Sequence, residues 1–306
     1  MDKPKNAEEL RDLVLKYINE NNYNAIADID VSDIDTFNFG SRNIGIFEYK
    51  DVSKIDFSKW DMSNAKDISS MFYQAKFGGN RTIENWDVSN VEDFSSCFSS
   101  AIGMQNLDLS KWNVSSGYDF GGMFAHSDFS GKGLDKWDMS NAHSINEMFK
   151  GCKNIDKSLD LSNWNVKKVS SMSFIFNESN FTGKGVDKWD VSNVEYFLNM
   201  FCENKNIDKN LDFSQWKLEK AEYMNGIFLY SNILENKNIR KLCLWDKYMD
   251  NVFFKSSMFG DEKGWYWFKE KYKCDIYSNI TAMNKKQKKS AKELIKSLKN
   301  YIIRDV

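Results

Sequence analysis

The segment SLDLSNWNVKKVSSMSFIF (158–176) carries the pattern that organises most of this 306-residue chain. Its tryptophan recurs at intervals of 25 to 27 residues, and a phenylalanine stands twelve residues after each of the seven tryptophans. A spacing copied seven times identifies a repeat protein, and we expect both columns to form its core. The columns are Trp60, Trp86, Trp112, Trp137, Trp164, Trp189 and Trp216, and Phe72, Phe98, Phe124, Phe149, Phe176, Phe201 and Phe228.

The apolar spacing within one repeat predicts its local structure. Around each tryptophan, apolar residues are two or three positions apart, as in NLDLSKWNV (106–114), which favours a short strand followed by a turn. Further along, the spacing is three and then adjacent, as in Ile68, Met71 and Phe72, which favours one or two helical turns. One repeat cannot bury these residues alone, so we expect the repeats to stack as the coils of a solenoid.

The segment 158–176 and the segment KWDMSNAHSINEMFKGC (136–152) resemble the BspA-like leucine-rich repeats of bacterial surface and mycoplasmal proteins. The family pattern is roughly LDLSNW/F-D-x-SNVxxMxxMFxxC, and the resemblance covers about residues 51 to 241. It implies that the LDLS segment forms the strand of a parallel sheet and that the MFxxC segment lies on an opposite, more helical wall. The family brings no catalytic residues, and its members are mostly adhesins or interaction proteins.

The expected fold class is therefore a leucine-rich-repeat-like solenoid with seven clear coils, one short parallel strand per coil and helical caps at both ends. We expect a helical cap and a degenerate first rung in residues 1–50, the solenoid in 51–241, and a helical cap with a basic last helix in 242–306. In the first of these regions, residues 6–21 form an amphipathic pattern in which Asn6 and Glu9 have the spacing of a capping box. In the last, residues 264–274 and 284–303 predict helices.

Composition and charge exclude several classes of protein. The chain is 42% hydrophobic and can bury a core, and its net charge of −2 gives no overall attraction to nucleic acid, so direct nucleic-acid binding is not expected. No stretch approaches the ~18 apolar residues of a membrane span, and the N-terminus lacks the apolar run of a signal peptide. The five scattered cysteines predict reduced thiols and a cytoplasmic protein, or a surface protein if a signal was removed. The oligomeric state is left open.

Few residues are suited to catalysis. The chain has only His126 and His143, in different columns of neighbouring coils, and it has no cluster of cysteines and histidines with metal-ligand spacing. The recurring run Trp-Asp/Asn-x-Ser-Asn predicts a tight turn at one corner of each coil, because these side chains bond to nearby backbone. We therefore expect no catalytic residue, no metal site and no cofactor.

One carboxylate per coil stands two or four residues before the tryptophan, which we call the acidic zigzag. A strand at this place would point these side chains outward, where they form either a docking strip for a basic partner or a divalent cation, or a solvated face neutralised by neighbours such as Lys59 and Lys111. The neutralised face is the simpler interpretation. The zigzag consists of Asp56, Glu84, Asp108, Asp135, Asp160, Asp187 and Asp212.

A second candidate binding site is the aromatic run at residues 265–268. Trp265 and Trp267 are residue types that anchor interfaces, although they are equally suited to closing the end of the core. The sequence thus favours a non-enzymatic module that binds a macromolecular partner, most simply another protein with a basic surface. Three alternatives stay open: a surface-displayed adhesin, an intracellular inhibitor (including a phage-encoded one) that sequesters a host enzyme or nucleic-acid-binding complex, and a hydrolase or transferase in the C-terminal segment.

Overall fold

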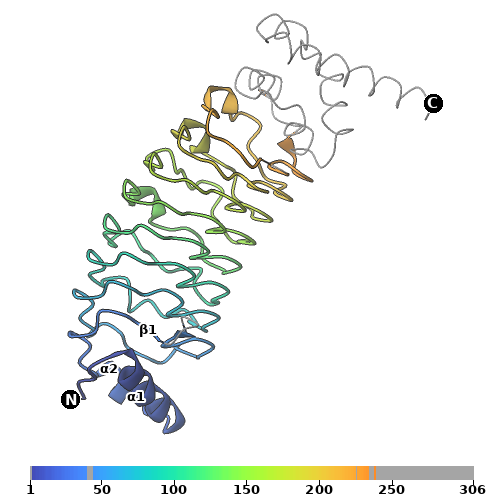
Figure 1. Ribbon diagram of the computed structural model, residues 1–306. Coiled ribbons are helices and arrows are strands. Elements are labelled where there is room, and N and C mark those ends of the chain that lie inside the picture. Colours follow the sequence, from blue (N-terminus) through green and yellow to red (C-terminus); the bar gives the residue numbers. More distant parts are fainter. Residues whose placement is uncertain (1, 40–43, 225, 234–237, 239–306) are drawn as a thin grey trace, which may run out of the picture.

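The computed structural model describes residues 2–39, 44–224, 226–233 and 238. Figure 1 shows successive repeats lying one on the next along a single direction, with two helices at the N-terminal end. Two short strands pair with each other as an antiparallel hairpin, and three single-turn 3-10 helices occur further along the chain. The elements are α1 (Ala7–Asn19), α2 (Tyr23–Ala27), β1 (Asn38–Phe39), β2 (Ile44–Gly45), η1 (Leu134–Lys136), η2 (Val186–Lys188) and η3 (Phe213–Gln215).

The predicted fold class, a leucine-rich-repeat-like solenoid with a parallel strand in each of seven coils, is wrong. Within the described ranges the only strands are β1 and β2, and their pairing is antiparallel. The segment before each of the seven tryptophans is a turn or, at η1, η2 and η3, a single-turn 3-10 helix instead of a strand. In the first repeat, the Ser58 amide donates to Oδ1 of Asp56 at 2.9 Å, and the Trp60 amide donates to the Phe57 carbonyl at 3.1 Å. Aspartate side chains that bind local backbone in this way compete with strand pairing.

Neighbouring repeats are joined by isolated parallel bridges that are one residue wide. The main series begins at Thr36 and then passes through the residue that stands seven positions after each tryptophan. A shorter series joins Asp51, Lys76 and Ile102. Each bridge is too short to count as a strand, which is why the stack contains little regular secondary structure. The main series consists of Thr36, Asp67, Asp93, Asp119, Ser144, Ser171, Tyr196 and Tyr223.

The wall that was predicted to be helical consists of tight turns. The Met71 amide donates to the Ile68 carbonyl at 3.1 Å, and Ser70, the third residue of this turn, has a φ of 55°, as in a type II turn. The Ser70 amide is therefore not used within a helix and donates to Ser95 of the next repeat at 2.9 Å. The left-handed backbone recurs ten residues after each tryptophan (Ser70, Ser96, Gly122, Glu147, Phe174, Asn199, Gly226) and again fourteen residues after it (Gln74, Ser100, His126, Gly151, Glu178, Glu203, Tyr230).

Each tryptophan connects its own repeat to the one before it. The indole Nε1–H donates to a buried backbone carbonyl of the preceding turn of chain, at distances from 2.7 to 3.2 Å. All seven indoles are between 1% and 4% exposed. The rings of Trp60 and Trp86 also stack, with centroids 6.3 Å apart and planes inclined by 6°. The acceptors, in order from Trp60 to Trp216, are Ile26, Phe57, Ile83, Leu109, Leu134, Leu161 and Val186.

The phenylalanines that follow the tryptophans by twelve residues form a continuous stack. All seven are buried, and neighbouring rings lie 5.3 to 5.9 Å apart between centroids. Phe47 extends this stack by one ring towards the N-terminus, 5.5 Å from Phe72. The offset between successive rings is set by the spacing of the repeats, so aromatic packing and the backbone bridges enforce the same separation.

The N-terminal helix predicted over residues 6–21 is confirmed as α1. The Asn6 side chain accepts the Glu9 amide at 2.9 Å, while the Glu9 carboxylate accepts the amide of Lys5. Leu10 and Val14 of α1 belong to the same buried core as the repeats. The helices predicted over residues 264–274 and 284–303, and the whole of the predicted C-terminal cap (242–306), lie outside the described residues.

The three described cysteines, Cys97, Cys152 and Cys202, are buried and unpaired. Burial raises the pKa of the Cys152 thiol to about 12, so it stays protonated at neutral pH. Cys243 and Cys274 lie outside the described residues. No helix in the described part of the chain is long and apolar enough to cross a membrane.

The tryptophan contact gives a prediction about stability. Replacing Trp137 by alanine removes a buried indole and should cost ~3–5 kcal/mol in free energy of unfolding. The variant Trp137→Phe keeps a ring but leaves the buried Leu109 carbonyl without its donor, so it should cost about 1–3 kcal/mol. Urea unfolding followed by far-ultraviolet circular dichroism measures both losses. The exposed Lys136→Ala change is the control and should stay within about 0.5 kcal/mol of the parent. Equal midpoints for parent and Trp137→Ala would contradict this account.

Candidate functional site

The acidic zigzag lies on the turns that precede the tryptophans, and most of its carboxylates bind other parts of the chain. Four members, each four residues before a tryptophan, accept the backbone amide of the serine two residues on, at 2.9 to 3.2 Å. These carboxylates therefore shape the turn. The four pairs are Asp56 with Ser58, Asp108 with Ser110, Asp160 with Ser162, and Asp212 with Ser214.

Cations from the same or the next repeat also neutralise much of the zigzag. The Glu84 carboxylate binds Arg81 through two hydrogen bonds, of 2.6 and 3.0 Å, and it also accepts the amide of Asp108 at 2.8 Å. Asp108 pairs with Lys132 of the following repeat at 2.9 Å, and this contact holds the pKa of Asp108 at about 2. Comparable ion pairs join Lys184 to Asp160 at 3.2 Å and Lys188 to Asp187 at 3.3 Å.

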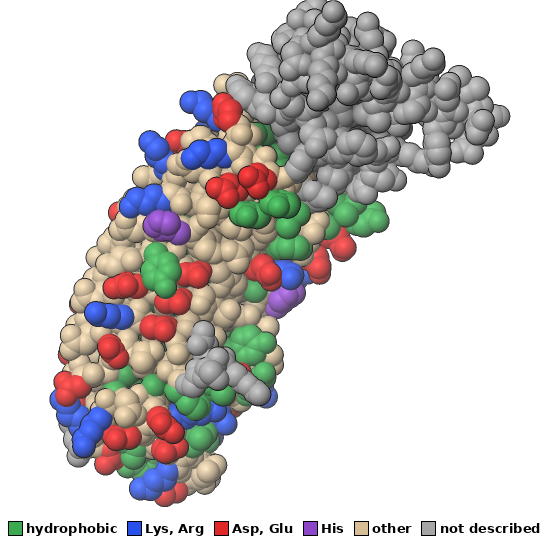
Figure 2. Space-filling model, viewed as in Figure 1, with side chains coloured by type: hydrophobic (Ala, Val, Ile, Leu, Met, Phe, Trp, Pro, Cys, Tyr) green, Lys and Arg blue, Asp and Glu red, His purple; other side chains and the backbone are tan. Residues whose placement is uncertain are grey.

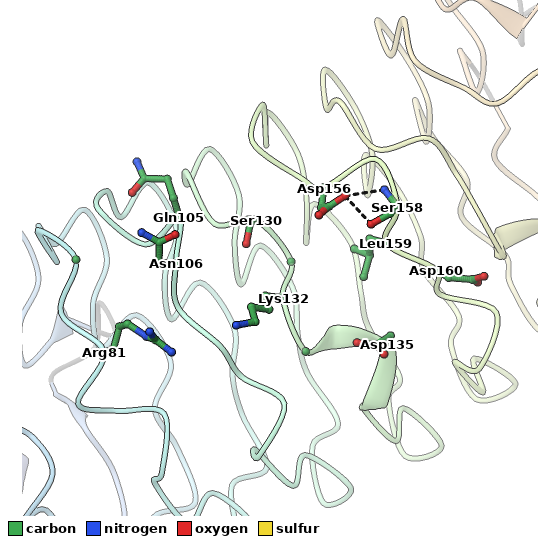
Figure 3. Close-up of a pocket in the computed structure, with 13 residues that line it drawn as sticks. Arg81, Gln105, Asn106, Ser130, Lys132, Asp135, Asp156, Ser158, Leu159 and Asp160 are labelled. Carbon is green, nitrogen blue, oxygen red and sulfur yellow. Dashed lines mark hydrogen bonds between the residues drawn. The ribbon is translucent and has the colours of Figure 1, made fainter.

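A shallow groove of about 750 Å³ crosses the same turns over several repeats. Figure 3 shows Arg81, Gln105 and Asn106 towards one end of it and Asp135, Asp156 and Asp160 towards the other, with Lys132 between them. Asp156 accepts both the amide and the hydroxyl of Ser158 at 2.7 Å. The groove thus brings together two zigzag residues, Asp135 and Asp160. Its walls are polar, and the cations nearest the first end are already paired within the chain.

Two glycines of the groove have left-handed backbone for different reasons. At Gly133, where φ is 94°, a Cβ atom would lie 2.2 Å from the backbone nitrogen of Ser110 in the preceding repeat. Gly79 has a similar φ of 87°, but a Cβ atom there would meet nothing within 4 Å. Gly133 therefore allows two repeats to approach closely, and Gly79 serves only the turn.

The described residues contain no grouping suited to metal-dependent or histidine-dependent chemistry. No set of three or more His, Cys, Asp and Glu side chains in this part of the chain could hold a metal ion. The His143 ring is occupied locally, because its Nδ1 lies 2.8 Å from the carbonyl of Asn141. His126 occupies one of the left-handed turn positions, next to Gly151.

A second surface strip, which the spacing around the tryptophans did not indicate, follows the main series of bridges. We define the ladder strip as the residues six and seven positions after each tryptophan. It holds six carboxylates and one lysine, and three of its tyrosines are 38% to 45% exposed. Figure 2 shows acidic side chains along the described repeats with hydrophobic side chains among them. The strip consists of Lys66, Asp67, Glu92, Asp93, Tyr118, Asp119, His143, Ser144, Ser170, Ser171, Glu195, Tyr196, Glu222 and Tyr223.

In the part of the chain that the structure describes, the carboxylates of the ladder strip form no ion pairs, whereas Glu84, Asp108, Asp160 and Asp187 of the zigzag each form one. Within the described ranges, no lysine, arginine or histidine forms an ion pair with any of the six. Burial, together with the neighbouring carboxylates of Asp67 and Asp119, raises the pKa of Asp93. The strip therefore carries six carboxylates against one lysine, Lys66, and none of the six is neutralised by an ion pair within the described structure.

The other predicted site residues, Trp265 and Trp267, lie outside the described residues, so the proposed aromatic anchor stays a prediction. The ladder strip had a visible signal in the sequence. Aspartate recurs in one column at positions 67, 93 and 119, and tyrosine stands in the same column at 196 and 223. That column was overlooked because a parallel strand was expected beside the tryptophan.

Turns that stack from one repeat to the next, with equivalent aromatic residues buried in columns along the stack, define a repeat protein. A family model described as "Mycoplasma protein of unknown function, DUF285" matches residues 43–160 and again residues 153–266. These matches span well over half of the chain, which belongs to this family. No curated protein and no solved structure matches it.

The ion pair of Asp108 predicts a pH dependence. Because its pKa falls from 3.8 to about 2 on folding, this carboxylate stabilises the protein above pH 3.8 and loses that effect as the pH falls towards 2. Asp108→Asn should therefore cost up to ~1 kcal/mol at neutral pH, and the deficit should shrink below about pH 4. Thermal melts of the parent and the variant between pH 7 and pH 3 measure how this difference in stability depends on pH. Asp56→Asn alters the equivalent turn of another repeat, where no ion pair is present among the described residues, and should therefore cost less stability. Equal losses of stability in the two variants would refute the role of Lys132.

The two glycines give a matched pair of variants. Gly79→Ala should cost about 1 kcal/mol, because alanine is strained in left-handed backbone. Gly133→Ala has the same strain and in addition forces two repeats apart, so it should cost ~2 kcal/mol more. Chemical unfolding measures the difference. If the two variants lose the same stability, the close approach at Gly133 has no energetic weight.

Proposed function

We propose that this chain is a non-enzymatic interaction module that binds another protein through the ladder strip. The observation that carries the proposal is the contrast between its two acidic surfaces. Within the described residues, four zigzag carboxylates form ion pairs with lysines or an arginine of their own chain, whereas none of the six ladder-strip carboxylates does, and the strip also carries exposed tyrosines. Unneutralised charge beside exposed aromatic rings is typical of surfaces that acquire their partner from another molecule.

Two further observations support this function. The seven repeats resemble BspA-like repeats, whose members are mostly adhesins or interaction proteins. The groove in Figure 3 is lined by glycines, amides, hydroxyls and charged side chains, of which Arg81, Lys132 and Asp160 form ion pairs within the chain, and this lining favours a non-enzymatic role. We accordingly propose that the partner is a protein with a basic surface and that the module works in the cytoplasm.

The alternative functions differ mainly in where the protein acts and in what its binding causes, and less in the interactions that would hold the partner. A surface adhesin is favoured by the BspA-like resemblance and would be found outside the cell. An intracellular inhibitor would lower the activity of the enzyme it binds. Catalysis by residues 242–306 would appear as turnover by the full chain. The zigzag and the pair Trp265 and Trp267 stay as competing binding surfaces for the same function.

The proposal is tested by installing a photo-crosslinking amino acid at Tyr118 and, as a control, at Asn113, which is exposed on the turn after its tryptophan. Irradiation in the native cell, followed by mass spectrometry, should identify one protein that crosslinks from Tyr118 and not from Asn113. Purified, that protein should bind the full chain saturably in calorimetry. Crosslinking from both positions to the same partner would contradict the assignment of the strip. Failure to recover any saturable partner would contradict the interaction function itself.

A further inference from the structure

The ladder strip has two aromatic centres separated by a neutral stretch. Towards the N-terminal end, Tyr118 is 45% exposed and lies among aspartates. Towards the C-terminal end, Tyr196 and Tyr223 stack with centroids 5.0 Å apart and planes inclined by 4°, and both remain exposed. The repeats between these centres place only a histidine and three serines on the strip, so its binding capacity is concentrated at the two centres.

Tyr118 lies in the field of several carboxylates. The Asp93 carboxylate, together with burial and with Asp119, Asp67 and Glu92, raises the pKa of the Tyr118 hydroxyl above its ordinary value. The ring is therefore an aromatic face surrounded by negative charge. Both features attract the same kind of group, because a cation is drawn to the face of an aromatic ring and to a carboxylate.

The carboxylates around Tyr118 are fixed in place before any partner arrives. The Ser95 amide donates to Oδ1 of Asp93, and the Gly121 amide donates to Oδ1 of Asp119, both at 2.8 Å. Asp67 is held in the same way by the Ser69 amide at 2.8 Å. Stacking three like charges on successive repeats is unfavourable, and a cation bound beside them would relieve that repulsion.

We propose that the ladder strip binds an extended arginine- or lysine-rich segment of a partner protein, with cationic side chains held at Tyr118 and at the Tyr196–Tyr223 pair. This inference rests on the proposed function and names the chemistry of the partner. The spacing of the repeats sets the distance between the two aromatic centres. Three repeats separate Tyr118 from Tyr196, which is about 14 Å at ~4.8 Å per repeat. An extended chain rises ~3.3 Å per residue, so the cationic residues should be about four or five positions apart.

The test uses the full chain and a fluorescein-labelled peptide of about twelve residues with two arginine pairs about five positions apart. Fluorescence anisotropy should show saturable binding that weakens strongly between about 20 mM and about 150 mM salt, and no binding of the same peptide with glutamine in place of arginine. Tyr118→Ala should weaken binding about fivefold or more, whereas Tyr118→Phe, which keeps the ring, should change it less than about twofold.

A charge-matched control separates the strip from the overall charge. Asp93→Asn combined with Asp119→Asn keeps both turn acceptors and should weaken binding about tenfold. Asp87→Asn combined with Asp138→Asn makes the same charge change at the turn after the tryptophan, where Asn113 and Asn165 already stand in other repeats, and should have no effect. Thermal melts confirm that all variants fold.

Equal weakening by the two pairs of substitutions, or equal binding of the arginine and glutamine peptides, would overturn the inference. Preferential binding of a single-stranded oligonucleotide would do the same. The proposed function is judged separately: if the crosslinked partner binds the parent and the variant Asp93→Asn with Asp119→Asn equally well, the chain is still an interaction module, but its partner is not recognised by cationic residues on this strip.

Discussion

The hydrogen bond from each tryptophan indole to a carbonyl of the preceding turn of chain is the contact on which the rest of the structure depends. It satisfies a buried polar atom on each side of the contact, and it fixes both the distance and the register between neighbouring repeats. Once the register is set, the phenylalanine stack, the isolated bridges and the turn hydrogen bonds all follow the same spacing. Residues of a given type consequently line up along the stack, which turns a column of the sequence into a strip on the surface.

The sequence indicated the period, the identity of the buried columns and the helix that became α1, because apolar spacing and capping chemistry are local. It did not indicate the secondary structure of the repeats. Ser70 and Gln74 have left-handed backbone although neither is a glycine, and nothing in a serine or a glutamine marks it for that conformation. The apolar spacing at Ile68, Met71 and Phe72 suits a helix equally well, so only the hydrogen bonds to the next repeat decide between the two.

The candidate site was predictable in part for a related reason. The sequence places one zigzag carboxylate in each repeat, but the role of each carboxylate depends on where the neighbouring repeat places its cations. Lys132 is distant from Asp108 in the sequence, yet the two pair across adjacent repeats. The ladder strip could not be recognised from its columns alone, because its importance comes from the lack of ion pairs to Asp93 and Asp119 among the described residues. In the sequence, a carboxylate that stabilises the fold cannot be distinguished from one that is left to bind a partner. The difference becomes visible only when the neighbours of each carboxylate in the structure are known.

The direction of the indole hydrogen bond has a consequence for how the protein is made. Each of the seven tryptophans from Trp60 to Trp216 donates to an earlier part of the chain, so a repeat that leaves the ribosome finds its acceptor carbonyl already present in the segment that emerged before it. At ~5–20 residues per second, a new repeat appears every one to five seconds or so, long enough for local turns to close before the next arrives. The helical segment that contains α1 and α2, whose Ile26 carbonyl accepts the indole of Trp60, is synthesised before the repeats and can act as the template on which their stacking begins. The indole hydrogen bonds and vectorial synthesis therefore run in the same direction, whereas backbone amides such as that of Ser70 gain their acceptor only when the next repeat has emerged.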